Sequence, residues 1–186
     1  MGRCLRKESA ELKIERVLFM KRENITLIGM PGSGKSTIGV ILAKALGYEF
    51  IDTDLLIQKQ EGRLLREIIA EDGLERFKEI ENQVNARVAC HRAVIAPGGS
   101  VVYGKEAMRH LSEISTVVYL KLSYETIAER IQDTEKRGVV LRPGQTLKDL
   151  YEERCPLYEQ YADVTVDAEQ EQAGDVMNLI LEQKLN

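Results

Sequence analysis

The sequence lacks any apolar run of the roughly 20 residues that a membrane-spanning helix needs. Its first residues are charged throughout, and they lack the apolar core that follows basic residues in a secretory signal. It also shows no internal repeat and no low-complexity linker. We therefore expect a cytoplasmic protein that has no contact with a membrane.

Cysteine is scarce, and the three residues present, Cys4, Cys90 and Cys155, are scattered without the spacing of metal ligands. An odd, dispersed set fits a reducing compartment better than a disulfide scaffold. His91 follows Cys90, but two adjacent ligands without a partner cluster favour a structural thiol and a surface imidazole. Basic residues are not in excess either, since the net charge is −4, which argues against a nucleic-acid partner.

The length of 186 residues allows one well-buried core but not two independent ones. Residues 1–22 differ from the rest because they are dense in charge and precede the first apolar segment. We interpret them as an N-terminal extension that the chemistry does not need, and residues 23–186 as a single domain. A short helix docked on that domain is the alternative for the extension.

Short apolar segments alternate with stretches of helical spacing along this domain. The apolar segments predict strands at residues 24–28, 48–51, 93–96, 116–120 and 164–166. Helices are expected at residues 36–46, from the second strand to about 89, and at 105–111, 123–131, 146–161 and 175–185. This alternation predicts an α/β fold, a five-stranded parallel sheet flanked by helices.

The strongest motif is a phosphate-binding loop. Residues 29–36 read Gly-Met-Pro-Gly-Ser-Gly-Lys-Ser, which matches G-x-x-x-x-G-K-[ST] between a strand and a helix. Glycines let backbone N–H groups turn toward an anion, the lysine reaches the β- and γ-phosphates, and the serine hydroxyl can ligate Mg²⁺. A chance glycine-rich turn is the alternative, but the strand and helix around the loop argue against it. The predicted ligand is Mg·ATP, and the predicted nucleotide-binding residues are Gly29, Gly32, Ser33, Gly34, Lys35, Ser36 and Thr37.

Two aspartates, Asp52 and Asp54, follow the second strand. Strand alternation would place both on one side, beyond the carboxyl end of a parallel strand, where ligands bind in such sheets. Two carboxylates there suit an indirect Mg²⁺ partner and an acceptor for a substrate hydroxyl proton. The alternative is that Asp54 caps the following helix. Gly98 and Gly99, at the end of the third strand, would also allow the backbone to approach a ligand closely, or would form a simple turn.

These motifs together resemble the shikimate kinases, within the wider nucleoside-monophosphate kinase group of P-loop kinases. The resemblance extends from about residue 24 to residue 167 and includes the phosphate loop and the Asp-Thr-Asp at 52–54. Its further motifs are Phe-Lys-Glu-Ile-Glu at 77–81, Gly-Gly-Ser at 98–100, Lys-Arg-Gly at 136–138, Arg-Cys-Pro-Leu-Tyr at 154–158 and Ala-Asp at 162–163. It implies a P-loop kinase fold with a mobile lid at about 132–145, substrate-binding helices and a monomer.

The resemblance also implies roles for individual residues. Asp54 would contact the substrate hydroxyls and accept a proton, and Asp52 would reach Mg²⁺ through water. Arg154 would bind a substrate carboxylate, Arg137 would approach the phosphates from the lid, and Arg130 would lie near adenine. The substrate would also contact Lys78, Gly98, Gly99 and Ser100, with Glu81 orienting the residue at position 78.

The chain departs from the family where substrate would be held. The family has arginine at position 78 and a third glycine at position 100, whereas this chain has Lys78 and Ser100. Residues 137–138 are Arg-Gly instead of Arg-Pro, and residues 139–140 are Val-Val instead of Leu-Leu. Lysine keeps the charge of arginine but loses its planar, two-pronged geometry.

Three functions stay open. The first is a shikimate kinase with a modified pocket, which makes shikimate 3-phosphate for aromatic amino-acid biosynthesis. The second is a paralogous kinase for another small hydroxy acid or polyol, which Lys78 and Ser100 favour. The third is a non-catalytic nucleotide-binding regulator, although Lys35, Asp52 and Asp54 are all present.

Overall fold

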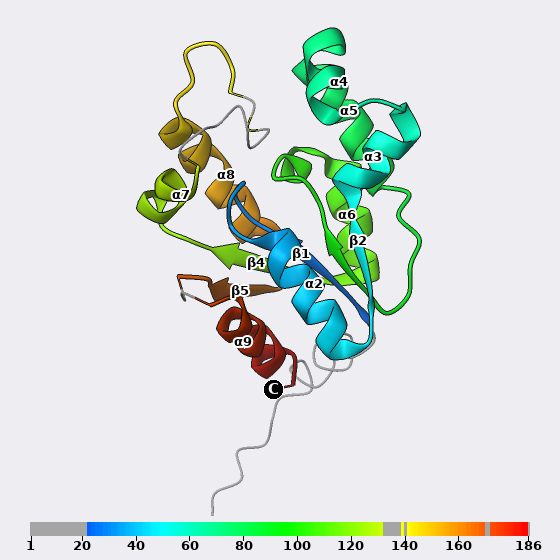
Figure 1. Ribbon diagram of the computed structural model, residues 1–186, viewed down its shortest axis with the longest axis vertical. Helices are drawn as coiled ribbons and strands as arrows, with labels where there is room; N and C mark the ends of the chain where they lie inside the picture. Colours follow the sequence, from blue (N-terminus) through cyan, green and yellow to red (C-terminus); the bar gives the residue numbers. More distant parts are fainter. Residues whose placement is uncertain (1–21, 132–138, 140, 170–171, 186) are drawn as a thin grey trace, which may run out of the picture.

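The computed structural model describes residues 22–131, 139, 141–169 and 172–185. Its centre is a parallel sheet of five strands in the order β2-β3-β1-β4-β5 (Figure 1). The strands are β1 (Asn24–Ile28), β2 (Glu49–Asp52), β3 (Ala93–Ala96), β4 (Ser115–Lys121) and β5 (Val164–Asp167). All five predicted strands are therefore present, each within two residues of its predicted bounds.

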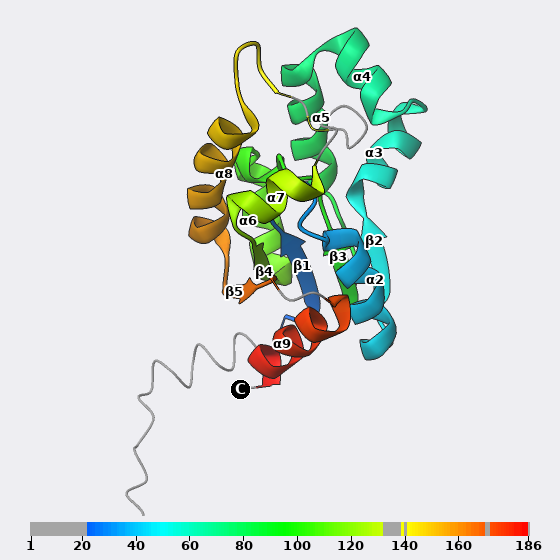
Figure 2. The same ribbon diagram turned by 60° about the vertical axis from the view of Figure 1, so that its left-hand side comes forward.

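Helices cover both faces of the sheet, as parallel strands require. The helices α2 (Lys35–Leu46) and α9 (Ala173–Leu185) pack together on one face, and α6 (Lys105–Ile114) and α8 (Leu147–Tyr161) cover the other (Figures 1 and 2). A short helix, α7 (Tyr124–Arg130), follows β4, and the Ser123 side chain caps it by accepting from the Thr126 N–H. None of the helices in the described residues is long and apolar enough to cross a membrane.

The segment after β2 forms a separate helical layer. It consists of α3 (Thr53–Glu61), α4 (Leu65–Asp72) and α5 (Leu74–Asn85), which pack around their own apolar cluster of Ile57, Ile68, Phe77, Ile80 and Val84. Figure 1 shows this layer beyond the carboxyl end of β2, across from the amino-terminal end of α8. The sequence predicted helices in this region without separating them. One element was not predicted, the 3-10 turn η1 (Val101–Tyr103) that follows β3.

Buried polar groups at the start of the sheet find partners within it. Asn24 donates to the carbonyls of Cys90 and Ile114 and accepts from the Ala93 N–H, so one side chain joins three segments. At the same level the Thr26 and Ser115 hydroxyls lie 2.6 Å apart. These contacts fix the amino-terminal ends of β1, β3 and β4. They thereby also fix the positions of the carboxyl ends of these strands, where ligands bind in such sheets.

Gly39 allows α2 to pack closely on the sheet. A Cβ at this position would lie 2.6 Å from Cε2 of Phe50 in β2. We therefore expect Gly39→Ala to lower the free energy of unfolding by about 1–3 kcal/mol through overpacking, although alanine alone would favour the helix by about 1 kcal/mol. Urea denaturation measures this change. Phe50→Leu should relieve the clash, so the double variant should lose less free energy of unfolding than the sum of the losses in the two single variants. Additive losses would contradict this packing.

Candidate active site

The loop between β1 and α2 has the backbone shape of an anion cradle. Gly29, Gly32 and Gly34 adopt φ angles of 149°, 79° and 93°, which favour glycine. A Cβ at Gly29 would also lie 2.9 Å from the Leu120 carbonyl oxygen. Gly34 is the N-cap of α2 and offers no side chain to the first N–H groups of that helix. Those N–H groups and the positive end of the helix dipole are thus directed at the site of an anion.

Lys35 is folded back onto this loop. Its Nζ donates to the carbonyls of Gly29 at 2.9 Å and Met30 at 3.0 Å. Burial lowers the pKa of Lys35 to about 8, and the nearby carboxylates, Asp54 first among them, oppose that shift. A phosphate group close to Nζ would supply the negative charge that favours the ammonium form.

The local structure that places Asp52 and Asp54 at the site differs from the predicted one. β2 ends at Asp52 and α3 begins at Thr53, so Asp54 is helical and strand alternation does not apply to it. The alternative of an Asp54 cap is also wrong, because Asp52 is the N-cap and its Oδ1 accepts from the Asp54 N–H at 3.0 Å. The turn of the helix nevertheless brings both carboxylates into one cavity with Lys35.

Oxygen donors suitable for Mg²⁺ lie beside the phosphate loop. The Ser36 hydroxyl donates to Oδ2 of Asp52 at 3.2 Å. Among the described residues no three metal-ligating side chains of histidine, cysteine, aspartate or glutamate gather at one point. The donors present fit the way Mg²⁺ is usually held beside nucleotides, by one or two protein oxygens together with phosphates.

Asp54 presents an oxygen without a partner. Its Oδ1 is buried and makes no hydrogen bond with the described residues. Burial and then the neighbouring Asp52 raise the pKa of Asp54 to about 6, against the pull of Lys35. A buried acceptor without a partner costs free energy, so this oxygen indicates a place for a ligand hydroxyl.

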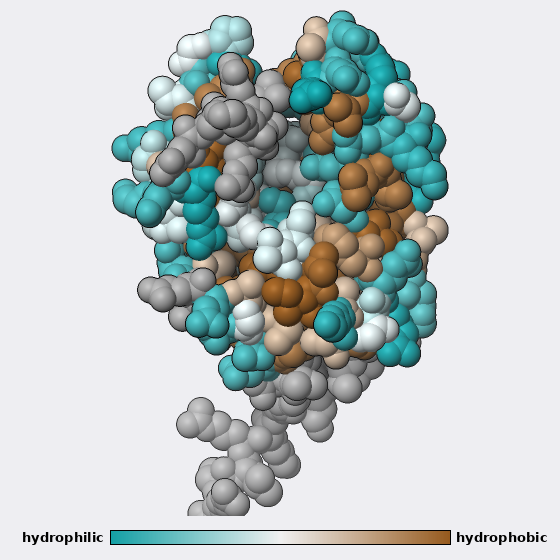
Figure 3. Space-filling model, viewed as in Figure 1, coloured by the Kyte–Doolittle hydropathy of each residue, from teal (hydrophilic) through white to brown (hydrophobic). Residues whose placement is uncertain are grey.

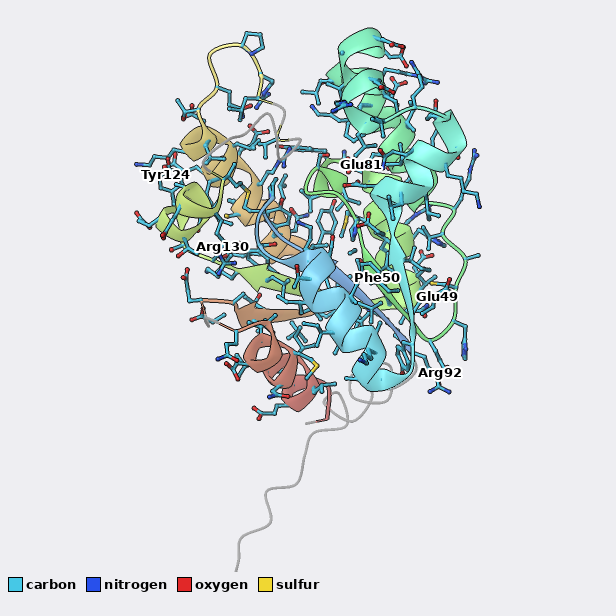
Figure 4. The ribbon with its side chains drawn as sticks, viewed as in Figure 1. Glu49, Phe50, Glu81, Arg92, Tyr124 and Arg130 are labelled. Carbon is cyan, nitrogen blue, oxygen red and sulfur yellow. The ribbon has the colours of Figure 1, made fainter. Side chains whose placement is uncertain are left out.

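These groups line a cavity of about 640 Å³. In Figure 3 a hollow is visible in the upper half of the molecule, beside the helical layer of α3, α4 and α5. Six of the seven predicted loop residues, all except Gly29, line it, together with Asp52, Asp54, Gly98, Gly99 and Arg130. Arg130 donates to the Gly32 carbonyl at 3.5 Å, and Figure 4 shows it across the phosphate loop from Glu81. The apolar residues Ala168, Ala173 and Val176, which the sequence did not indicate, line the same cavity.

Gly98 lies between two buried carboxylates. A Cβ there would lie 2.9 Å from Oδ1 of Asp54 and would collide with Oε1 of Glu81. Glu81 is only 1% exposed, and its Oε2 accepts from the Ser100 hydroxyl at 2.6 Å while Oε1 has no partner in the described residues. Position 98 therefore lies between two unpartnered carboxylate oxygens, and a residue with a side chain would not fit there.

Arg154 and Lys78 are not among the residues that line the cavity. Arg154 is 7% exposed, and its Nη1 lies next to Gly99, 3.1 Å from the position of a Cβ. It has no carboxylate within ion-pair distance among the described residues. Lys78 is paired with exposed Glu75 at 2.8 Å instead of with Glu81. Thus Arg154 is a buried cation without an anionic partner, which is rare unless an anion binds there.

Some predicted residues lie outside the described part of the chain, and some site residues were not predicted. Arg137 and Gly138 lie outside the described residues. The family resemblance implies only an orienting role for Glu81, although its spacing from Phe77, Ile80 and Val84 puts it on the buried face of α5. Tyr103, which contacts both Lys78 and Arg154, carries no signal in the sequence because η1 itself was not predicted.

Burial of Glu81 should make the stability of the protein depend on pH. Burial raises the pKa of Glu81 from 4.5 to about 7, so folding takes up a proton between these values. The free energy of unfolding should then fall as the pH rises from about 4.5 to about 7. Glu81→Gln cannot ionise, so its stability relative to the wild type should be higher at pH 8 than at pH 5, by about 1–3 kcal/mol.

Chemical denaturation across this pH range tests the expectation. Glu79→Gln is the matched control, because Glu79 is exposed on the same helix and pairs with Arg76 on the surface. The control should leave the slope of stability against pH unchanged. Parallel slopes for the wild type and Glu81→Gln would contradict the burial of an ionisable Glu81.

Comparisons with known proteins agree with this architecture. A family model described as "Shikimate kinase" matches residues 31–184. A shikimate kinase of Persephonella marina is 35% identical over 159 residues, which cover 85% of this chain and 96% of that protein. One of Synechococcus sp. is 40% identical over 164 residues, covering 86% of this chain and 83% of that protein.

Solved structures give the same result. The shikimate kinase from Acinetobacter baumannii, solved in complex with shikimate, matches with a TM-score of 0.79 at 31% identity. The match covers 91% of this chain and 97% of that one. The predicted P-loop kinase fold is thereby confirmed, with its parallel sheet of five strands and flanking helices. By the family model, the relatives and the solved structures alike, the chain belongs to the shikimate kinase family.

Proposed function

We propose that this protein transfers the γ-phosphoryl group of ATP to a hydroxyl of shikimate, which gives shikimate 3-phosphate and ADP. The observation that carries the proposal is the position of Gly98 and Gly99. Asp54 lines the same cavity as the phosphate loop and Lys35, and its unpartnered Oδ1 lies 2.9 Å from the Cβ position of Gly98. Arg154, which has no ion pair among the described residues, lies 3.1 Å from the Cβ position of Gly99. A small acid with hydroxyl groups satisfies both free groups at once.

The phosphate loop and its neighbours would form the nucleotide side of the site. Phosphates would bind to Gly29, Gly32, Ser33, Gly34, Lys35, Ser36 and Thr37, and Arg130 would lie toward the base. Ser36 would hold Mg²⁺ directly and Asp52 through water, supported by the 3.2 Å separation of their oxygens. Mg²⁺, when bound, supplies positive charge that neutralises the phosphates.

The acceptor side follows from its unpartnered groups. Asp54 accepts the proton of the attacking hydroxyl, and Arg154 binds the carboxylate in the two-pronged way that its guanidinium allows. As the hydroxyl oxygen forms its bond to the γ-phosphorus, the bond to the β–γ bridging oxygen breaks and ADP leaves. The chain's own contribution is positioning and charge, with Lys35 beside the transferred group. Arg137, the other cation predicted to act there, lies outside the described residues.

We also propose residues 23–186 as the catalytic domain. The family match begins at residue 31, and β1 begins at Asn24. Arg22 ion-pairs with Asp163 at 3.1 Å, so the boundary lies close to this residue. A chain starting at Arg22 that lost shikimate-dependent activity would contradict this boundary.

The proposal is tested by ADP release in a coupled assay with Mg·ATP. Shikimate should stimulate turnover above the rate without acceptor, and Lys35→Ala should lower kcat on the order of 10²–10³-fold because it removes a preorganised charge at the phosphates. Turnover of another hydroxy acid or polyol but not of shikimate would instead support the paralogous kinase that Lys78 and Ser100 favour.

Lys78 and Ser100 should act as a coupled pair. Ser100 is the donor to Glu81, whereas Lys78 pairs with Glu75. Ser100→Gly alone leaves Glu81 without a hydrogen bond and should raise the KM for shikimate about tenfold. Adding Lys78→Arg provides a guanidinium that can reach Glu81, so the double variant should recover most of that loss. Steady-state kinetics of the four proteins measures the coupling, and independent effects of the two changes would refute it.

A further inference from the structure

Tyr103 connects the two cationic side chains of the acceptor side. It ends η1, between α5 and α8, and its ring carries Lys78 Nζ at 5.1 Å and Arg154 Cζ at 5.3 Å from its centre. Each distance is short enough for a cation–π contact. Lys78 comes from α5 and Arg154 from α8, and both lie over this one ring.

The hydroxyl of Tyr103 has a defined hydrogen-bond direction. It donates to Oε1 of Glu153 at 2.7 Å, so its oxygen is available to accept from Nε of Arg154 at 3.3 Å. Glu153 is itself held, because its Oε2 accepts from Gln145 at 3.0 Å and from Arg142. The Nε edge of the guanidinium is therefore occupied by Tyr103, while Nη1 lies beside Gly99 and the cavity.

The charges around this cluster leave Arg154 open to an added anion. Lys78 has Glu75 as a partner, and Glu153 is shared between Tyr103, Gln145 and Arg142. Glu81 is engaged by Ser100. Arg154 donates to the neutral hydroxyl of Tyr103, also interacts with the neutral side chain of Tyr158, and has no ion pair among the described residues. Two like charges over one ring would be stabilised by a carboxylate placed between them.

We propose that Tyr103 is a positioning residue that fixes Arg154 and Lys78 for the carboxylate of the acceptor, and so makes the enzyme select acidic acceptors over neutral ones. This inference rests on the proposed function. The hydroxyl sets the rotation of the guanidinium about Nε, so that Nη1 lies beside Gly99, a residue that lines the cavity. The ring also contacts the ammonium of Lys78.

The test compares Tyr103→Phe with the wild type on two acceptors, shikimate and its methyl ester, which lacks the negative charge. For shikimate, the KM of the variant should rise about 3- to 10-fold, which is the range expected for the loss of one ordinary hydrogen bond, with little change in kcat. The KM for the ester and the KM for ATP should stay the same. The preference for the acid should therefore shrink by the same factor.

Tyr151→Phe is the matched control, since it removes one hydroxyl from α8 that donates to the Leu122 carbonyl at 2.7 Å, away from Lys78 and Arg154. It should leave the preference for the acid unchanged. Glu153→Ala is a second variant, which should shrink the preference in the same direction by releasing the Tyr103 hydroxyl. Equal rises of KM for acid and ester in Tyr103→Phe would overturn the inference and leave the proposed function intact. A wild type that turns over neither acceptor would overturn both.

Discussion

The site depends on how buried charges compensate one another around Gly98. Asp54 and Glu81 approach this glycine from α3 and α5, and no side chain separates them. Both carboxyl groups have their pKa raised by burial, to about 6 and about 7. Lys35 and Arg154 are the cations that offset this charge, and neither forms an ion pair with it among the described residues. The buried carboxylates and the buried cations in the described part of the chain are thus not paired with one another, and both remain available to a ligand.

Most of the fold and the nucleotide half of the site follow from local sequence. Strands at the centre of a parallel sheet are short apolar runs, so all five were predicted close to their observed bounds. The phosphate loop is equally local, because glycines at positive φ, the lysine and the serine are consecutive in the chain. Asp52 and Asp54 were placed in the cavity, but by an incorrect argument, since helix capping and not strand alternation brings them there.

The acceptor half could be predicted only in part because its contacts are between distant segments. Ser100 bonds to Glu81 and Arg154 to Tyr103, and no spacing rule connects these residues. The short turn η1 places Tyr103, and three residues without an apolar period give little signal. The contact of Lys78 with substrate stays a prediction, and no spacing rule indicates that its ammonium lies over Tyr103 and pairs with Glu75. Which partner a lysine takes depends on packing between helices.

The residues at positions 78 and 100, where the chain departs from the family, are linked through the hydrogen bonding of Glu81. A buried Glu81 needs a hydrogen-bond donor, and a lysine that pairs elsewhere does not provide one. The hydroxyl of Ser100 provides it at 2.6 Å, from a position where glycine would leave Oε2 without a partner. Lys78 is then free to share the ring of Tyr103 with Arg154. In this arrangement the cationic charge of the acceptor side is retained, and the ring of Tyr103 together with Glu75 orients the ammonium of Lys78. A pocket can thus change the residue at position 78 and still present positive charge to an acid.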